Sequence, residues 1–182
     1  MSELKRWRTI RSAIAFSTPW FAIRQDDCVV NESAETPFYI IDTADWVCVV
    51  AITEAGELIL VRQYRHGWGH ITLELPAGEV QTGEEVIAAA RRELAEETGY
   101  IGGEAALIGA TSPNPARYSN KLHIVLINAP KKLAALKNDP EEQTEPMVWP
   151  MQSVRSLFLN ESFVNSSQAG ALAIALASLG AV

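Results

Sequence analysis

Cysteine, basic residues and long apolar runs are all scarce in this sequence, and each scarcity excludes a class of protein. Only two cysteines occur, Cys28 and Cys48, and both lie in apolar segments of the kind that form strands. We therefore expect two small buried side chains and no disulfide framework. This favours a reducing, cytoplasmic compartment.

Basic residues number 15 against 22 acidic ones, which gives a formal net charge of −7. Nucleic acids and anionic lipid surfaces are bound through clustered positive charge, so we expect no nucleic-acid partner and no membrane partner. An anionic small molecule would need a local feature of the protein to bring it in.

The carboxy-terminal run QAGALAIALASLGAV is apolar nearly all round. It is shorter than the roughly 18 to 20 residues that a membrane span requires. We predict a helix here that is buried or packed at an interface, with Ser166 and Ser167 as candidate amino-terminal caps. At the other end, Ser17, Thr18 and Pro19 interrupt the apolar core that a secretion signal would need.

The 182 residues, 48% of them hydrophobic, are sufficient for one domain with a substantial core. Patterns typical of strands lie at residues 20–30, 37–53, 57–65, 71–80, 105–112, 121–129 and 147–151. A helical pattern runs from about residue 82 to Thr98, where Gly99 supplies the stop, and further helices are expected at 154–160 and at the carboxy terminus. This order predicts an α/β sandwich with a mixed sheet at 46–182 and a small antiparallel sheet at 1–45.

The stretch RRELAEETGY, residues 91–100, places several carboxylates on the central helix. At about 100° per residue, the apolar side chains of this helix share one face, and Glu93 and Glu97 project together at its edge beside Glu96. Clustered carboxylates repel one another, and a hard cation such as Mg²⁺ removes that penalty. The turn before the helix, LPAGEV, can direct a backbone carbonyl, that of Ala77, at the same cation. The alternative is a solvated face in which Arg92 pairs with Glu96 four residues later.

Residues 78–100, GEVQTGEEVIAAARRELAEETGY, resemble the Nudix box. That motif reads Gly, five residues, Glu, seven residues, then Arg-Glu-apolar-any-Glu-Glu-any-Gly-apolar. The matching positions are Gly78, Glu84, Arg92, Glu93, Leu94, Glu96, Glu97 and Gly99. Tyr100 departs from the pattern, since an aliphatic residue is usual there.

The resemblance implies a Nudix-type α/β/α sandwich that hydrolyses the diphosphate of a nucleoside diphosphate derivative with Mg²⁺ or Mn²⁺. By position in the motif, the metal ligands would be Glu93, Glu96, Glu97 and the Ala77 carbonyl. Arg92 would orient the glutamates by ion pairing, and Glu96 would take part in catalysis as a ligand or bridge.

The segment LVRQYRHGWGHITLELPAG is similar to its counterpart in ADP-ribose pyrophosphatases, and Pro115 falls where that subfamily carries a proline. The resemblance implies that ADP-ribose is hydrolysed to AMP and ribose 5-phosphate. Alternatives are GDP-mannose, ADP-glucose or NADH as substrate, or a nucleotide-sugar sensor without catalysis. Arg65 can grip a diphosphate and Glu74 can accept hydrogen bonds from a ribose or adenine, although exposed arginine is also common at strand ends.

Stacking on the base is the expected role of Trp20 or Tyr118, with Trp46 a further candidate, although aromatic side chains are more often part of a core. The acidic loop DPEEQTEP matches in position a loop that carries a catalytic base in related enzymes. Glu142 is the first candidate for that base and Glu141 the second, with a plain solvated loop as the alternative. Related proteins are homodimers that exchange their amino-terminal sheets, so the resemblance also implies a homodimer.

Overall fold

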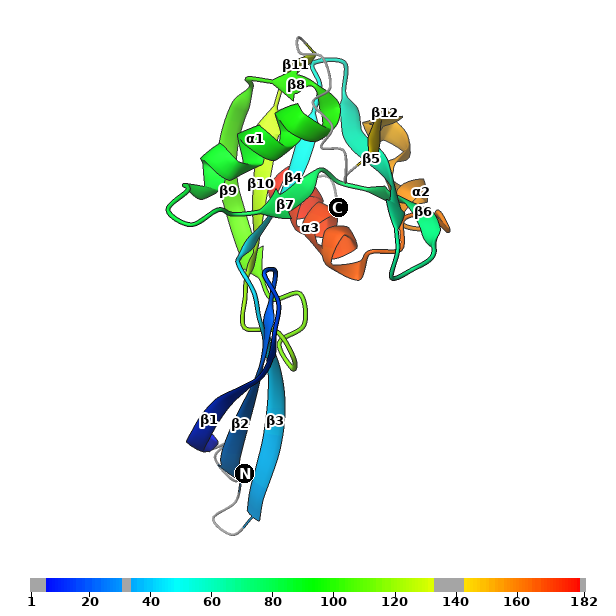
Figure 1. The fold of residues 1–182 in the computed structure, drawn as a ribbon. Helices are drawn as coiled ribbons and strands as arrows, with labels where there is room; N and C mark the ends of the chain where they lie inside the picture. The colour runs from blue at the N-terminus through cyan, green and yellow to red at the C-terminus, as the bar shows by residue number, and fades with distance from the viewer. Residues whose placement is uncertain (1–5, 31–33, 133–142, 181–182) are drawn as a thin grey trace. The chain divides into compact units, whose positions relative to one another are not determined.

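Residues 6–30, 34–132 and 143–180 are described by the computed structural model, and the chain forms two units (Figure 1). One unit comprises Met1–Ala44 with Ser112–Lys121, and the other comprises Asp45–Thr111 with Leu122–Val182. The chain first passes from one unit to the other between Ala44 and Asp45, whereas a boundary was expected after residue 45. Residues 112–121 also belong to the amino-terminal unit, which was not predicted from the sequence.

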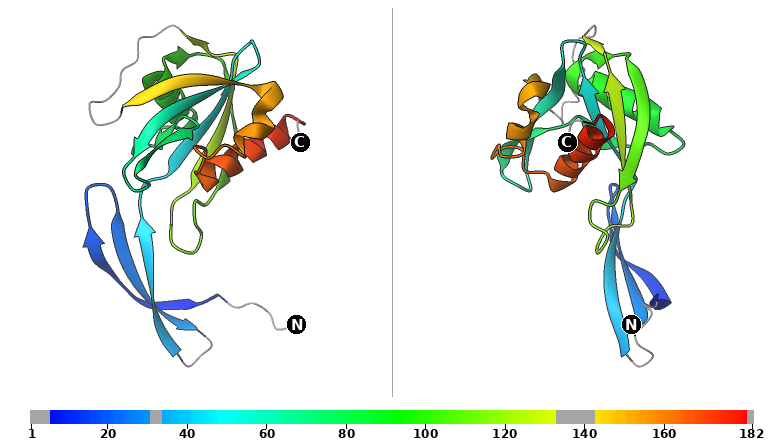
Figure 2. Two further views of the ribbon diagram at one scale, coloured as in Figure 1. Left: turned by 90° about the vertical axis from the view of Figure 1, so that its right-hand side faces the viewer. Right: turned by 180° about the vertical axis from the view of Figure 1, so that it is seen from behind.

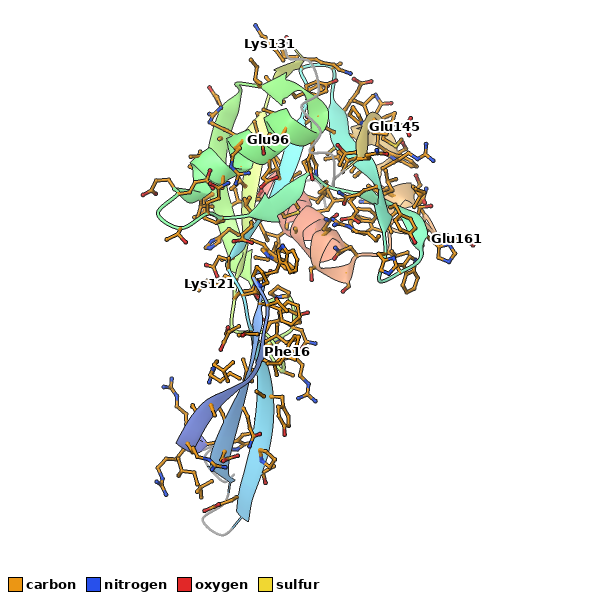
Figure 3. All side chains as sticks on the ribbon, in the orientation of Figure 1. Phe16, Glu96, Lys121, Lys131, Glu145 and Glu161 are labelled. Carbon is orange, nitrogen blue, oxygen red and sulfur yellow. The ribbon has the colours of Figure 1, made fainter. Side chains whose placement is uncertain are left out.

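The smaller unit is a three-stranded antiparallel sheet in the order β1–β2–β3, formed by Arg8–Ser17, Ala22–Val30 and Ala34–Asp42. Every residue of β1 is exposed in the single chain, including the large apolar side chains of Ile14 and Phe16. Figure 3 labels Phe16 on this sheet. Strand β1 was not predicted from the sequence, because a strand with no buried face need not show a regular apolar alternation.

The larger unit is built on a seven-stranded mixed sheet with the order β12–β5–β4–β10–β9, in which β6 also pairs with β5 and β7 with β4. Only the pair β4–β10 is parallel among these described strands. The strands are β4 (Trp46–Ile52), β5 (Glu57–Arg65), β6 (His70–Glu74), β7 (Ala77–Glu79), β9 (Glu104–Thr111), β10 (Leu122–Asn128) and β12 (Thr144–Pro150). A two-stranded sheet joins β8 (Tyr100–Ile101) and β11 (Lys131–Lys132).

Two long helices cover opposite faces of this sheet (Figures 1 and 2). Helix α1 (Val86–Thr98) packs Ala89, Ala90 and Leu94 against one face, where the core includes residues of β4, β5 and β10. Helix α3 (Ser166–Ser178) packs on the other face. A short 3₁₀ turn (Met151–Ser153) and α2 (Val154–Leu157) precede α3. The predicted α/β sandwich with a mixed sheet is therefore confirmed.

Helix α3 buries four apolar side chains within the chain, so the carboxy-terminal run is a core helix. Its amino-terminal cap is Asn165, whose side chain accepts hydrogen bonds from the N–H groups of Ser167 and Gln168. The caps predicted at Ser166 and Ser167 were therefore wrong by one or two residues, because a short amide side chain caps as well as a hydroxyl. None of the helices in the described residues has the length and apolarity needed to cross a membrane.

Candidate active site

The predicted acidic edge is present on α1. Glu93 and Glu97 are buried, with 8% and 5% of their surfaces exposed, while the side chain of Glu96 is 45% exposed (Figure 3). The helix ends at Gly99, which adopts the left-handed conformation with φ of 74° and donates its N–H to the carbonyl of Ala95. Because the apolar face of α1 packs on the sheet, the position of the helix determines where its glutamates lie relative to the strands.

Strand β7 presents its backbone to these glutamates. Its pairing with β4 is set by the bonds from Val49 N–H to the Pro76 carbonyl, 2.8 Å, and from Val80 N–H to the Asp45 carbonyl, 2.9 Å. Because antiparallel pairs alternate, the N–H and carbonyl of Ala77 point away from β4. The Ala77 N–H donates to Glu97 Oε2 at 3.2 Å, so the carbonyl of Ala77 lies at the same edge.

Gly78 allows the helix and the strand to approach each other. A Cβ built at this position would overlap the carboxylate of Glu93, through Oε1, Cδ and Oε2. Only the absence of a side chain at residue 78 lets the Glu93 carboxylate lie against β7.

Arg92 joins the carboxylates into one network. Its Nε and Nη2 bond both oxygens of Glu84 at 2.9 Å, and its Nη1 bonds Glu93 Oε1 at 2.7 Å and Glu96 Oε2 at 3.1 Å. Its Nη2 also donates to the Glu79 carbonyl at 2.9 Å. The hydrogen bonds from Arg92 hold the pKa of the Glu84 carboxyl below its usual value. The Arg92–Glu96 pair of the solvated-face alternative is therefore present, within a network that also includes two partly buried carboxylates.

The donors at this edge fit a hard divalent cation in chemical type. Three glutamates of α1 and the Ala77 carbonyl offer oxygen ligands. Arg92 bonds two of these glutamates, Glu93 and Glu96, and also Glu84 and the Glu79 carbonyl. No group of three or more His, Cys, Asp or Glu side chains in the described part of the chain is close enough together to hold a metal as it stands. In this structure Glu93 Oε1 and Glu96 Oε2 are both bonded to Arg92 Nη1.

A cavity of about 290 Å³ lies next to this edge. Its walls come from β7, from the starts of β4 and β10, from the end of β5 and from the start of α3. The lining residues are Trp46, Arg65, Ala77, Gly78, Glu79, Leu122, Asn165, Ser167 and Gln168. The candidate metal edge and a cavity of ligand size therefore share the residues Ala77–Glu79.

Arg65 and Glu74, the predicted substrate contacts, are bonded to each other. Arg65 Nε and Nη2 donate to the two carboxylate oxygens of Glu74 at 2.7 and 2.8 Å. Glu74 is only 2% exposed, whereas the Arg65 side chain is 44% exposed and lines the cavity. Arg65 is consequently the member of the pair that faces the cavity.

The remaining predicted site residues lie elsewhere in the chain. Trp20 is in the smaller unit, at the β1–β2 turn, and is 72% exposed. Tyr118 is in the same unit, where it forms a β-bridge with Ile41. Glu141 and Glu142 lie outside the described residues.

The cavity wall at the start of α3, formed by the cap residue Asn165 with Ser167 and Gln168, was not predicted from the sequence. One signal was available: Gln168 is a polar residue that opens an otherwise apolar helical run. Its partner on another strand could not be deduced from that position alone.

The chain is similar to known proteins in sequence and in fold. The model of the NUDIX domain family matches residues 43–163. An ADP-ribose pyrophosphatase of Bacillus subtilis (strain 168) is 28% identical over 145 residues, 80% of this chain and 77% of that protein. The ADP compounds hydrolase NudE of Escherichia coli (strain K12) is 30% identical over 128 residues, 69% of this chain and 67% of that protein.

An ADP-ribose pyrophosphatase of Mycobacterium tuberculosis (strain ATCC 25618 / H37Rv) is 27% identical over 171 residues, 92% of this chain and 83% of that protein. The crystal structure of an ADP compounds hydrolase matches with a TM-score of 0.88 at 23% identity and covers 100% of both chains. That structural match shows a shared fold.

Proposed function

The chain belongs to the NUDIX domain family of hydrolases, and we propose that it hydrolyses the diphosphate of ADP-ribose to AMP and ribose 5-phosphate. One observation supports this above the others: the buried carboxylates of Glu93 and Glu97 lie against β7, whose residues line a cavity of ligand size. Two relatives named ADP-ribose pyrophosphatase, each aligned over most of this chain, support the choice of substrate.

In the proposed reaction, water attacks one phosphorus and the bridging P–O bond breaks. Glu93, Glu96, Glu97 and the Ala77 carbonyl would hold Mg²⁺ or Mn²⁺, which when bound would supply charge neutralisation of the diphosphate oxygens and a lowered pKa for the attacking water. Arg92 orients the Glu93 and Glu96 carboxylates through its hydrogen bonds. Arg65, in the cavity wall, binds the diphosphate oxygens.

The proton of the attacking water needs an acceptor, and we assign this role to Glu142, with Glu141 as the second candidate. Both lie in the acidic loop that matches the base-carrying loop of related enzymes, outside the described residues. Trp20 and Tyr118 stay candidates for stacking on the base. The proposed setting is the cytoplasm, which agrees with the two free and buried thiols of Cys28 and Cys48.

The test is a substrate panel with Mg²⁺ and, in parallel, with Mn²⁺. ADP-ribose is expected to be cleaved at least tenfold more efficiently, in kcat/KM, than GDP-mannose, ADP-glucose or NADH, a preference of about 1.4 kcal/mol. AMP and ribose 5-phosphate are to be identified as products by chromatography. A higher kcat/KM for another member of the panel would overturn the substrate assignment. Binding of ADP-ribose without any product would instead support a sensor.

We also propose a homodimer formed through the amino-terminal sheet. Strand β1 is exposed along its whole length in the single chain, and the exposed apolar side chains of this unit include Trp7, Ile14, Phe16 and Trp20. Contiguous exposed apolar surface is typical of protein interfaces. Gel filtration with light scattering is expected to give twice the chain mass of 19.9 kDa. A mass of one chain would contradict the dimer.

A further inference from the structure

Gln168, in the first turn of α3, is buried and yet polar, with 4% of its surface exposed. Its side-chain Oε1 accepts a hydrogen bond from the Leu75 N–H at 2.7 Å. Its Nε2 donates to Glu74 Oε2 at 2.9 Å. One side-chain amide therefore joins α3 to the end of β6, immediately before the turn that leads into β7.

The carboxylate of Glu74 is fully used by protein donors. Oε1 accepts from Thr72 Oγ1 at 2.6 Å and from Arg65 Nε at 2.7 Å, and Oε2 accepts from Arg65 Nη2 at 2.8 Å and from Gln168 Nε2. A carboxylate offers about four acceptor positions, so these four bonds occupy it. Glu74 in this arrangement acts on a ligand through Arg65.

The network also keeps Glu74 charged. Burial disfavours the charge, but the hydrogen bonds from Arg65 and Thr72, with that from Gln168, hold the pKa of Glu74 below its usual value. A buried carboxylate that stays ionised depends on each of its donors, because an unsatisfied one is costly to bury. Loss of the Gln168 donor therefore loosens the carboxylate that holds Arg65.

Arg65 and Gln168 both line the cavity, together with Ala77 and Gly78 of the metal edge. The direction of the Arg65 guanidinium is set by a two-point bond to Glu74, and the direction of Glu74 is set in part by Gln168. Bidentate arginine pairs of this kind fix geometry as well as add energy.

We propose that Gln168 is a positioning residue: by bonding Glu74 and Leu75, it fixes the direction in which Arg65 meets the anionic part of the ligand in the cavity. The identity of that anion, a diphosphate, rests on the proposed function. The link from α3 to Arg65 rests on the hydrogen bonds alone.

The main test is Gln168→Met, which removes both hydrogen bonds at nearly the same side-chain length. We expect KM to rise about tenfold, as for the loss of a hydrogen bond to a charged group, while kcat changes by less than about threefold. A readout without substrate is the Arg65 Nε–Hε signal in a ¹⁵N-resolved NMR spectrum, assigned by its loss in Arg65→Lys. This signal is expected to shift or broaden in Gln168→Met.

Gln168→Glu is the second variant, and it remains informative if Gln168→Met does not fold. It keeps an acceptor for the Leu75 N–H but places a carboxylate where Glu74 now receives a donor, so the Arg65 signal and KM should change at least as much. Adding Glu74→Gln to Gln168→Met tests the route, because residues that act through one another are not additive. The double variant is expected to have the KM of Glu74→Gln within about twofold.

Leu176→Ala is the matched control on the same helix. Leu176 is 1% exposed in the apolar core, so this change weakens the packing of α3 without touching the network. It should lower the Tm while leaving KM and the Arg65 signal as in the wild type. An unchanged Arg65 signal in both Gln168 variants, or the same KM rise in Leu176→Ala, would overturn the proposal. If the wild type cleaves no substrate, the proposed function fails, and the NMR comparison still decides the role of Gln168.

Discussion

Replacing Glu97 by Gln is expected to lower kcat for ADP-ribose by about a thousandfold, with the fold intact. The amide oxygen of glutamine can still accept the Ala77 N–H, so the contact between α1 and β7 survives. The negative charge that would bind the cation is lost, and metal stabilisation of the transition state is worth several kcal/mol. Steady-state rates across a Mg²⁺ titration, with a thermal melt of each protein, measure the two effects separately.

Glu85→Gln is the matched control for this change. Glu85 is exposed, precedes the same helix and makes no capping hydrogen bond through its side chain, so the substitution removes the same charge at the other end of α1. Its kcat should stay within about twofold of the wild type, since isolated surface charges contribute little. A Glu97→Gln enzyme with near-normal kcat would remove Glu97 from the proposed metal site.

Gly78→Ala is expected to lower kcat/KM about a hundredfold while changing the Tm by only a few degrees, a loss of the size seen when the surroundings of a metal ligand are disturbed. The added Cβ overlaps the Glu93 carboxylate, which is the far end of a flexible side chain and can swing aside at low cost to folding. The carboxylate then leaves the position against β7 where it would bind the cation. We therefore expect kcat/KM to fall in this variant while Tm stays close to that of the wild type.

The control is Gly67→Ala, which adds the same methyl group at a glycine of the larger unit where no atom beyond the adjacent residues lies within 4 Å of the new Cβ. It should leave both kcat/KM and Tm close to those of the wild type. If Gly78→Ala were equally silent, the close approach of Glu93 to β7 would have no part in catalysis.

The acidic helix was largely predictable from the sequence. Its apolar residues recur at helical spacing, Gly99 marks its end, and both are local signals that need no knowledge of the rest of the chain. The contact between Glu97 and the Ala77 backbone was only suggested, because it depends on the pairing register of β7 with β4. Register is decided by tertiary packing and turn geometry, which a single sequence does not show.

The Arg65–Glu74 pair was predicted only as two separate substrate contacts. Their mutual bond runs diagonally from β5 to β6, whose register places Arg65 opposite His70 and Glu74 opposite Val61, and Glu74 is also bonded to Gln168 of α3. The segment 37–53 was similarly predicted as one strand-like run, but it contains β3 and β4, which belong to different units. Both differences come from long-range contacts that local periodicity cannot encode.

The bonds of Gln168 also determine when the site can form as the chain folds. Its bond to Leu75 spans 93 positions of the sequence and its bond to Glu74 spans 94. The bond between His123 and Asp45 spans 78 positions. Contacts of such separation form late, because the intervening chain must first lose its freedom. A nascent chain that ends before Asn165 already carries every glutamate of α1 but lacks the helix that steadies Arg65. Catalytic competence is thus expected to be among the last properties that this chain acquires during its synthesis.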